Sequence, residues 1–88
     1  MKVLLFGTLE EIIGQKYLDI PYEQGMTISK LLEWISDRFP KFRDFYEKIS
    51  DEDLADYMLI TIDGNIVHKE KLLKENDLIK IFLPLSGG

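Results

Sequence analysis

The residues with the clearest chemical potential are the last two, Gly87 and Gly88. Glycine has no Cβ, so a Gly-Gly ending can pass through a channel that excludes side chains. A free carboxylate there can be activated as an acyl adenylate, whose carbonyl carbon then accepts a nucleophile. Chain ends also tolerate change, so small terminal residues alone decide nothing. Here the ending follows directly on a predicted core strand and Pro84 marks the exit, which favours a functional, mobile tail over residues 83–88.

Length and composition predict one domain that spans residues 1–88. The chain has 88 residues, of which 45% are hydrophobic, enough for one small core. No apolar run approaches the length of a membrane span. The apolar run at the N-terminus, residues 1–6, is too short for a signal peptide. We therefore expect a cytoplasmic protein that does not interact with membranes.

The composition argues against several classes of site. The chain has no cysteine and a single histidine, His68, which excludes disulfides, thiolate metal sites and a cysteine nucleophile. The acidic residues 51–53 lack the ligand spacing of a calcium loop and are interpreted as a solvated connection. A net charge of −5, with Arg38 and Arg43 the only arginines, argues against nucleic acid as a partner. An acidic carrier would suit a partner with a basic docking surface.

The first half of the chain predicts two strands and one long helix. Residues 2–6 and 16–20 have strand patterns, with a helical turn at 9–13 between them, closed by Gly14. From residue 28 to 39 apolar residues recur at helical spacing after Thr27, a suitable N-cap, and Pro40 ends the pattern. Residues 42–49 are compatible with a short second helix.

The second half predicts two further strands. They cover residues 58–63, followed by a turn at 63–65 and a short continuation at 66–67, and residues 78–82. A helical turn is predicted at 69–73. One long helix covers only one face of a sheet, so the order of elements predicts an α+β fold with the helix on one side.

Alternation within the strands predicts which side chains face away from that helix. Lysines are rarely buried unpaired, so Lys2 and Lys80 should face outwards, and alternate residues of the same strands go with them. In the strand at 58–63, Met58, Ile60 and Ile62 form the apolar set, so Leu59 lies on the opposite side. The outward set then contains an apolar patch: Leu4, Phe6, Leu59 and Phe82. A patch of this size favours a protein interface. The alternative is that the aromatic segment 42–57 folds over it.

Three segments resemble a known family. They are residues 2–14, residues 76–82 and the ending Leu83-Pro84-Leu85-Ser86-Gly87-Gly88. They closely resemble the MoaD/ThiS-like, ubiquitin-like sulfur carriers, above all the small subunit of molybdopterin synthase. The resemblance implies a β-grasp fold with a mixed sheet. In the family, two prolines commonly precede the last four residues, whereas Leu83 precedes Pro84 here, and the sulfur acceptor stays open.

The resemblance also implies a function and partners. A ubiquitin-activating-like enzyme would adenylate Gly88 with ATP, and a sulfur donor would convert it to a thiocarboxylate. The large synthase subunit would then take the sulfur for a cyclic pyranopterin, on the way to the molybdenum or tungsten cofactor. The carrier would bind no cofactor or metal itself. Contacts with partners are expected from Phe6, Leu59, Ile66 and Phe82 and from residues 83–86 (Leu83, Pro84, Leu85 and Ser86); Ile66 enters through the resemblance alone.

Two other functions share the same ending. Related Gly-Gly proteins modify target lysines through an isopeptide bond, and others carry sulfur for a different pathway such as thiamin synthesis. A third possibility is a β-grasp interaction domain whose Gly-Gly has no chemical role. The sequence does not separate sulfur transfer from protein modification, because both begin with the same adenylate.

Overall fold

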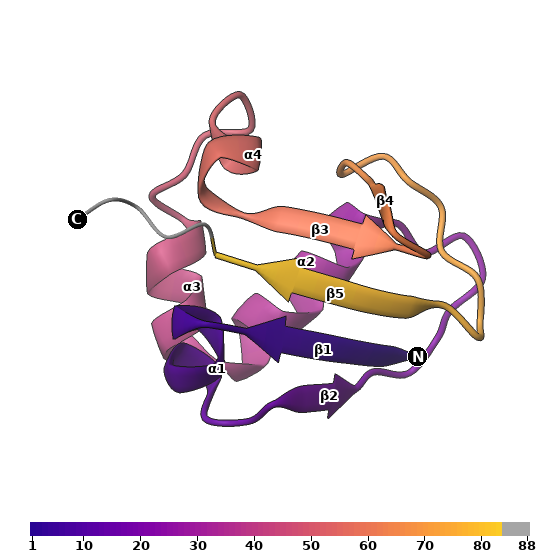
Figure 1. Cartoon of the computed structure of the whole chain (residues 1–88), viewed down its shortest axis with the longest axis horizontal. Coiled ribbons are helices and arrows are strands. Elements are labelled where there is room, and N and C mark those ends of the chain that lie inside the picture. The colour runs from indigo at the N-terminus through magenta and orange to yellow at the C-terminus, as the bar shows by residue number, and fades with distance from the viewer. Residues whose placement is uncertain (84–88) are drawn as a thin grey trace.

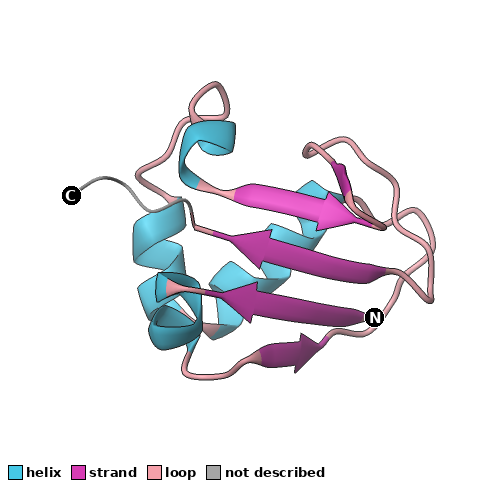
Figure 2. Ribbon diagram, in the orientation of Figure 1, coloured by secondary structure: helices cyan, strands magenta, loops and turns pink. Residues whose placement is uncertain are grey.

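The computed structural model describes residues 1–83, and these form an α+β fold with one mixed sheet (Figures 1 and 2). The sheet has five strands in the order β2-β1-β5-β3-β4. Their bounds are β1 Lys2–Phe6, β2 Tyr17–Asp19, β3 Leu59–Ile62, β4 Asn65–Ile66 and β5 Leu78–Phe82. β1 and β5 are parallel, whereas the other neighbours are antiparallel. The predicted α+β class and mixed sheet are confirmed.

The helices lie against one side of the sheet and at its end, with α2 behind the strands in Figure 1. The bounds are α1 Thr8–Ile13, α2 Ile28–Arg38, α3 Pro40–Tyr46 and α4 Leu54–Tyr57. The main helix, α2, has 11 residues, and the other three are short. No helix within residues 1–83 is long and apolar enough to cross a membrane.

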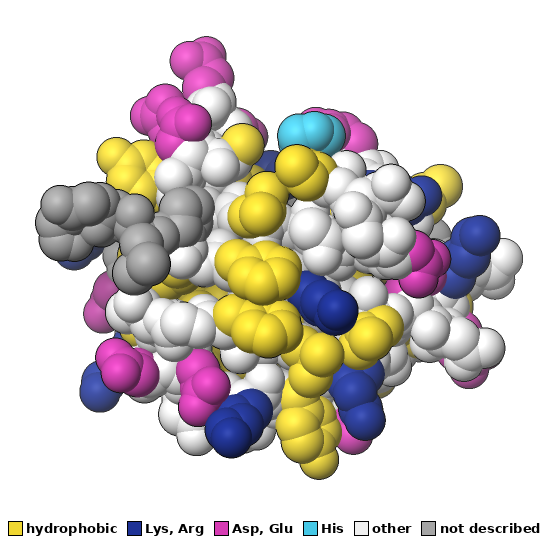
Figure 3. All heavy atoms as spheres, viewed as in Figure 1, with side chains coloured by type: hydrophobic (Ala, Val, Ile, Leu, Met, Phe, Trp, Pro, Cys, Tyr) yellow, Lys and Arg dark blue, Asp and Glu magenta, His cyan; other side chains and the backbone are white. Residues whose placement is uncertain are grey.

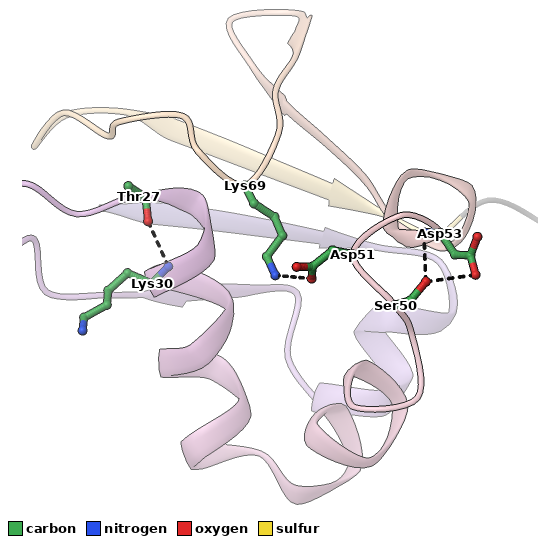
Figure 4. Close-up of polar contacts among 6 residues, drawn as sticks. All are labelled: Thr27, Lys30, Ser50, Asp51, Asp53 and Lys69. Carbon is green, nitrogen blue, oxygen red and sulfur yellow. Dashed lines mark hydrogen bonds and ion pairs between the residues drawn. The ribbon is translucent and has the colours of Figure 1, made fainter.

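The N-terminus of α2 is capped from two directions. The Thr27 side chain accepts a hydrogen bond from the Lys30 backbone N–H at 3.2 Å (Figure 4), which confirms the predicted N-cap. The N–H groups of the first two helical residues donate to the carbonyls of Lys71 and Lys69, each at 3.0 Å. These bonds satisfy donors that a helix leaves without partners in its first turn.

The same contacts explain why the predicted helical turn at 69–73 is wrong. Its carbonyls accept hydrogen bonds from α2, so they are not available for a helix of their own. Leu72 forms an isolated bridge with Thr27, and its side chain is exposed while that of Leu73 is buried. The segment is therefore extended apart from a turn at residues 69–70.

An ion pair fastens this extended segment to the loop before α4. Lys69 Nζ lies 2.6 Å from Asp51 Oδ1 (Figure 4) and 5.7 Å from the ring centroid of Tyr46. The hydrogen bond to Asp51 raises the pKa of the Lys69 ammonium above its ordinary value of 10.5, against a smaller effect of burial. Ser50 and Asp53 hydrogen-bond to each other in the same loop. The acidic residues are thus a solvent-facing connection, as predicted.

One core lies between the sheet and the helices. β1, β3 and β5 bury alternate side chains: Val3, Leu5, Ile60, Ile62, Ile79 and Ile81. They meet the apolar stripe of α2, which is Ile28, Leu31, Leu32 and Ile35. α3 adds Phe42, which is fully buried and stacks on Tyr46 with ring centroids 5.7 Å apart. The aromatic side chains of α3 therefore pack against the core. Because Phe42 is fully buried there, it does not cover the outer patch.

Candidate functional site

The face of the sheet opposite the core is the candidate functional site, and we call it the outer face. The inward residues of β1, β3 and β5 are buried, so their neighbours along each strand point to the outer face. All four residues of the predicted patch lie there: Leu4, Phe6, Leu59 and Phe82. The orientation predicted from the two lysines is confirmed.

Strand register places three of these side chains in one row across the three central strands. Phe82 of β5 is opposite Phe6 of β1 on one side and opposite Leu59 of β3 on the other. The rings of Phe6 and Phe82 stack with centroids 4.5 Å apart and an interplanar angle of 10°. Phe6 nevertheless stays 37% exposed. The row therefore presents a stacked apolar surface to solvent in the isolated domain.

A second row crosses the whole sheet beside the first. In strand order it reads Tyr17, Leu4, Lys80, Thr61 and Ile66. Ile66 is 59% exposed at the far edge, so a residue expected only from the family resemblance belongs to the same surface. Tyr17, at 50% exposure, extends the surface on β2. Sequence reasoning missed Tyr17, although the inward pattern of Leu18 and Ile20 in the same segment was a usable signal.

The space-filling view in Figure 3 shows the outer face as a continuous surface. Hydrophobic side chains form a band across its middle, and a basic side chain lies directly against that band. Acidic side chains lie mainly around the edges of this view. Beside β3 and β4, a groove of about 390 Å³ continues the surface towards α4, and Leu59 and Ile66 both line it.

The chain leaves the sheet beside this apolar surface. Because β1 and β5 are parallel, they end at the same edge, where Phe6 and Phe82 form the last pair. Leu83 follows at once and is partly buried against the core. Gly7, which follows Phe6, has φ 65° and ψ −139°, a conformation that is essentially restricted to glycine. A Cβ on Gly7 would lie 4.0 Å from the carbonyl oxygen of Leu83, so these two residues are neighbours at the exit.

The remaining expected site residues cannot be placed. Pro84, Leu85, Ser86, Gly87 and Gly88 lie outside the described residues. Within residues 1–83, no three His, Asp or Glu side chains come close enough together to hold a metal ion. His68 is exposed in the segment after β4.

Comparison with known proteins agrees with this architecture. The model of the ThiS family matches residues 3–88. The solution structure of small archaeal modifier protein 1 from Methanosarcina acetivorans is 31% identical, with a TM-score of 0.78 over 99% of this chain and 94% of that one. A comparison with curated protein sequences gave no match.

Two more distant structures share the fold. The crystal structure of SAMP1 from Haloferax volcanii is 20% identical, with a TM-score of 0.81 over 99% of this chain and 97% of that one. A putative molybdopterin converting factor subunit 1 from Pyrococcus furiosus is 22% identical, with a TM-score of 0.75 over 96% and 95%. These likenesses confirm the ubiquitin-like β-grasp fold, and the match to the family model over nearly the whole sequence identifies the chain as a member of the ThiS family.

Proposed function

We propose that this protein is a sulfur carrier for the biosynthesis of molybdopterin, the pterin part of the molybdenum or tungsten cofactor. In this proposal Gly88 is the reactive residue, and its free carboxylate is the group that reacts. The ThiS family match and the fold shared with the Pyrococcus furiosus converting-factor subunit support this function. The partners are an ATP-using adenylating enzyme and a large synthase subunit, and the setting is the cytoplasm.

The main observation behind the proposal is the position of the outer face. Its apolar row lies directly beside the point where the chain leaves the sheet. The stacked pair Phe6–Phe82 belongs to the last residues of two parallel strands, and the chain continues from Phe82 directly into Leu83. A partner that binds this surface would hold the tail at a fixed starting point. Gly88 is the fifth residue after Leu83. Docking of the outer face therefore confines Gly88 to a small volume inside the partner.

The proposed chemistry divides between the tail and its partners. The Gly88 carboxylate attacks the α-phosphate of ATP, and pyrophosphate leaves, which gives an acyl adenylate. A donor of sulfide-level sulfur attacks the acyl carbon and displaces AMP, which forms the thiocarboxylate without a change of oxidation state. Its sulfur then passes to a cyclic pyranopterin in the large subunit, and the carrier returns to the carboxylate by hydrolysis. The carrier's carboxylate is the nucleophile towards ATP and, as the acyl adenylate, the electrophile towards the sulfur donor, and the partners supply the acid–base groups.

Each expected site residue has a role in this scheme. Phe6, Leu59, Ile66 and Phe82 bind the partner from the outer face, and Leu83 sets the direction in which the chain leaves. Pro84, Leu85 and Ser86 lie inside the partner's channel, and the two glycines let the backbone reach its narrowest part.

The decisive experiment is intact-mass measurement of the purified protein after incubation with ATP, a cognate adenylating enzyme and a sulfur donor. Exchange of one oxygen for one sulfur at Gly88, located by fragmentation, supports the proposal. A control chain that lacks Gly88 should stay unmodified. An intact protein whose mass is unchanged, while a known carrier is modified by the same enzyme preparation, would refute it.

A second candidate is a ubiquitin-like protein modifier. The 31% identity to small archaeal modifier protein 1 of Methanosarcina acetivorans favours it. Digested proteins from cells that express a tagged form of the chain would then carry a Gly-Gly remnant on target lysines. Sulfur on the free carrier without such remnants would favour sulfur transport alone.

Sulfur transport for another pathway, such as thiamin synthesis, is the third candidate. It predicts the same thiocarboxylate but a different acceptor. Offering the thiocarboxylated protein to the large synthase subunit with a cyclic pyranopterin separates the two, since only a molybdopterin carrier loses its sulfur there.

A further inference from the structure

The outer face has a positive charge at its centre, and this charge is the basis of the inference. Lys80 is in the middle of the second row, between Leu4 of β1 and Thr61 of β3. Along its own strand it is flanked by Leu78 and Phe82, which point to the same side. Its neighbours in all four directions are therefore three large apolar residues and one threonine.

No described acidic side chain neutralises this lysine. Within residues 1–83 the ion pair closer than 4.0 Å is that of Lys69 and Asp51, which line the groove beside Leu59, and it does not involve Lys80. Lys2 and Asp19, which also point to the outer face, are opposite each other on β1 and β2. In the free protein, water solvates the Lys80 ammonium, since the residue is exposed.

A partner that covers the apolar rows must also cover this charge. β5 is the central strand, with two strands on each side, and neighbouring strands are about 4.8 Å apart. To reach water at the edge of a covered sheet, the ammonium would have to extend about 10 Å across the neighbouring strands. The four-carbon stem of lysine is too short for this. A buried ammonium without a partner is strongly unfavourable, so it must be paired or hydrogen-bonded.

We propose that the partner protein that docks on the outer face places an Asp or Glu carboxylate against Lys80. This inference rests on the proposed function, because it takes the large synthase subunit as that partner. It specifies the partner's contact surface as apolar with an acidic residue at its centre. The net charge of −5 points the other way, towards a basic partner. Total charge governs approach over long distances, whereas contact chemistry is local, and locally this face is cationic.

Such a pair would select between partners as well as strengthen binding. A surface with a lysine or arginine at the same place would bring two like charges together in a dry contact, and this costs binding energy. A wholly apolar surface would leave Lys80 unpaired. Lys80 would thus favour an acidic-centred partner over other proteins that recognise an apolar sheet face.

The test measures the dissociation constant between the carrier and the purified large subunit by calorimetry. Lys80→Met keeps the apolar stem and removes the charge, and Lys80→Glu reverses it. Lys30→Glu is the matched control, because Lys30 is exposed on α2, behind the sheet. We expect Lys80→Met to weaken binding about 30-fold or more, since the partner carboxylate is then buried alone, and Lys80→Glu to weaken it further. The control should stay within roughly threefold of wild type.

Charge reversal on the partner completes the experiment. Acidic residues on its apolar docking surface are replaced by lysine one at a time, and one such change should restore binding of Lys80→Glu while weakening binding of the wild type. Binding of Lys80→Met that equals or exceeds that of the wild type would overturn the inference and leave the proposed function intact. If the wild-type carrier itself fails to bind the large subunit, both are overturned.

Discussion

Replacement of Phe82 by aspartate should abolish docking without unfolding the protein. Phe82 is only partly buried, so the isolated domain loses part of its packing rather than a core side chain. Loss of the stack with Phe6 costs about 0.5–1.5 kcal/mol. Half of a phenylalanine's burial adds about 1 kcal/mol. A domain of this length has a free energy of unfolding of roughly 4–13 kcal/mol, so a loss of about 2 kcal/mol leaves it folded.

The same replacement should weaken binding to the large subunit severely, although it leaves the protein folded. A stacked aromatic at the centre of an interface contributes about 2 kcal/mol or more, and a buried aspartate adds the cost of removing a carboxylate from water. We therefore expect affinity for the large subunit to fall at least about 30-fold. Circular dichroism should give a wild-type spectrum at 25 °C and a melting temperature lower by roughly 8–16 °C.

Leu72→Asp is the matched control for this variant. Leu72 is 60% exposed, but it belongs to the segment that caps α2 and not to the outer face. Its change to aspartate should leave the affinity unchanged. Wild-type affinity in a folded Phe82→Asp protein would refute the assignment of the outer face as the docking surface, and so would an equal loss in both variants.

Three further predictions concern stability. Gly7→Ala should lower the free energy of unfolding by about 1–3 kcal/mol, measured by urea denaturation, because alanine is strained at this φ and ψ; an unchanged midpoint would contradict the local backbone geometry. Phe42→Ala should cost about 3–5 kcal/mol by the same measurement, since its fully buried ring fixes α3 to the core, and a loss below 1 kcal/mol would contradict that packing. Lys69→Met should cost only about 0.2–1 kcal/mol, because Asp51 is largely exposed. The Lys69 pKa is raised on folding, so its contribution is present below pH 10.5 and disappears as the pH rises above the folded pKa; a pH-stability profile that differs from that of Lys69→Met at neutral pH but not at high pH checks this.

Local patterns were sufficient for most of the fold. The α2 helix has a capping threonine, an apolar stripe and a terminating proline, and each signal acts within a few residues. The faces of β1 and β5 were predictable because a single lysine in a strand fixes the orientation of its neighbours, and the face of β3 because its apolar residues alternate. The outer patch followed from that rule without knowledge of which strands pair.

Errors arose where distant parts of the chain determine the structure. Residues 69–73 were predicted to form a helical turn, yet the carbonyls of Lys69 and Lys71 accept hydrogen bonds from the N-terminus of α2, some 40 positions earlier in sequence. The alternation with Leu18 and Ile20 gives the side to which Tyr17 points, but its place beside Leu4 depends on the pairing of β1 and β2. The central position of Lys80 likewise depends on the strand order, which no local pattern encodes.

The parallel pairing of β1 and β5 also governs how the protein can fold during synthesis. β5 is the middle strand of the sheet but the last of these five strands to be made, and it pairs with β1, the first of them. Until residues 78–82 leave the ribosome, β1 and β3 have no common neighbour and Ile79 and Ile81 are missing from the core. The nascent chain must therefore wait with exposed apolar side chains, and its folding should be slow for its size because the key contacts are distant in sequence. A ribosome stalled shortly before β5 would hold an unfolded, protease-sensitive chain, so this domain can fold only after residues 78–82 have emerged.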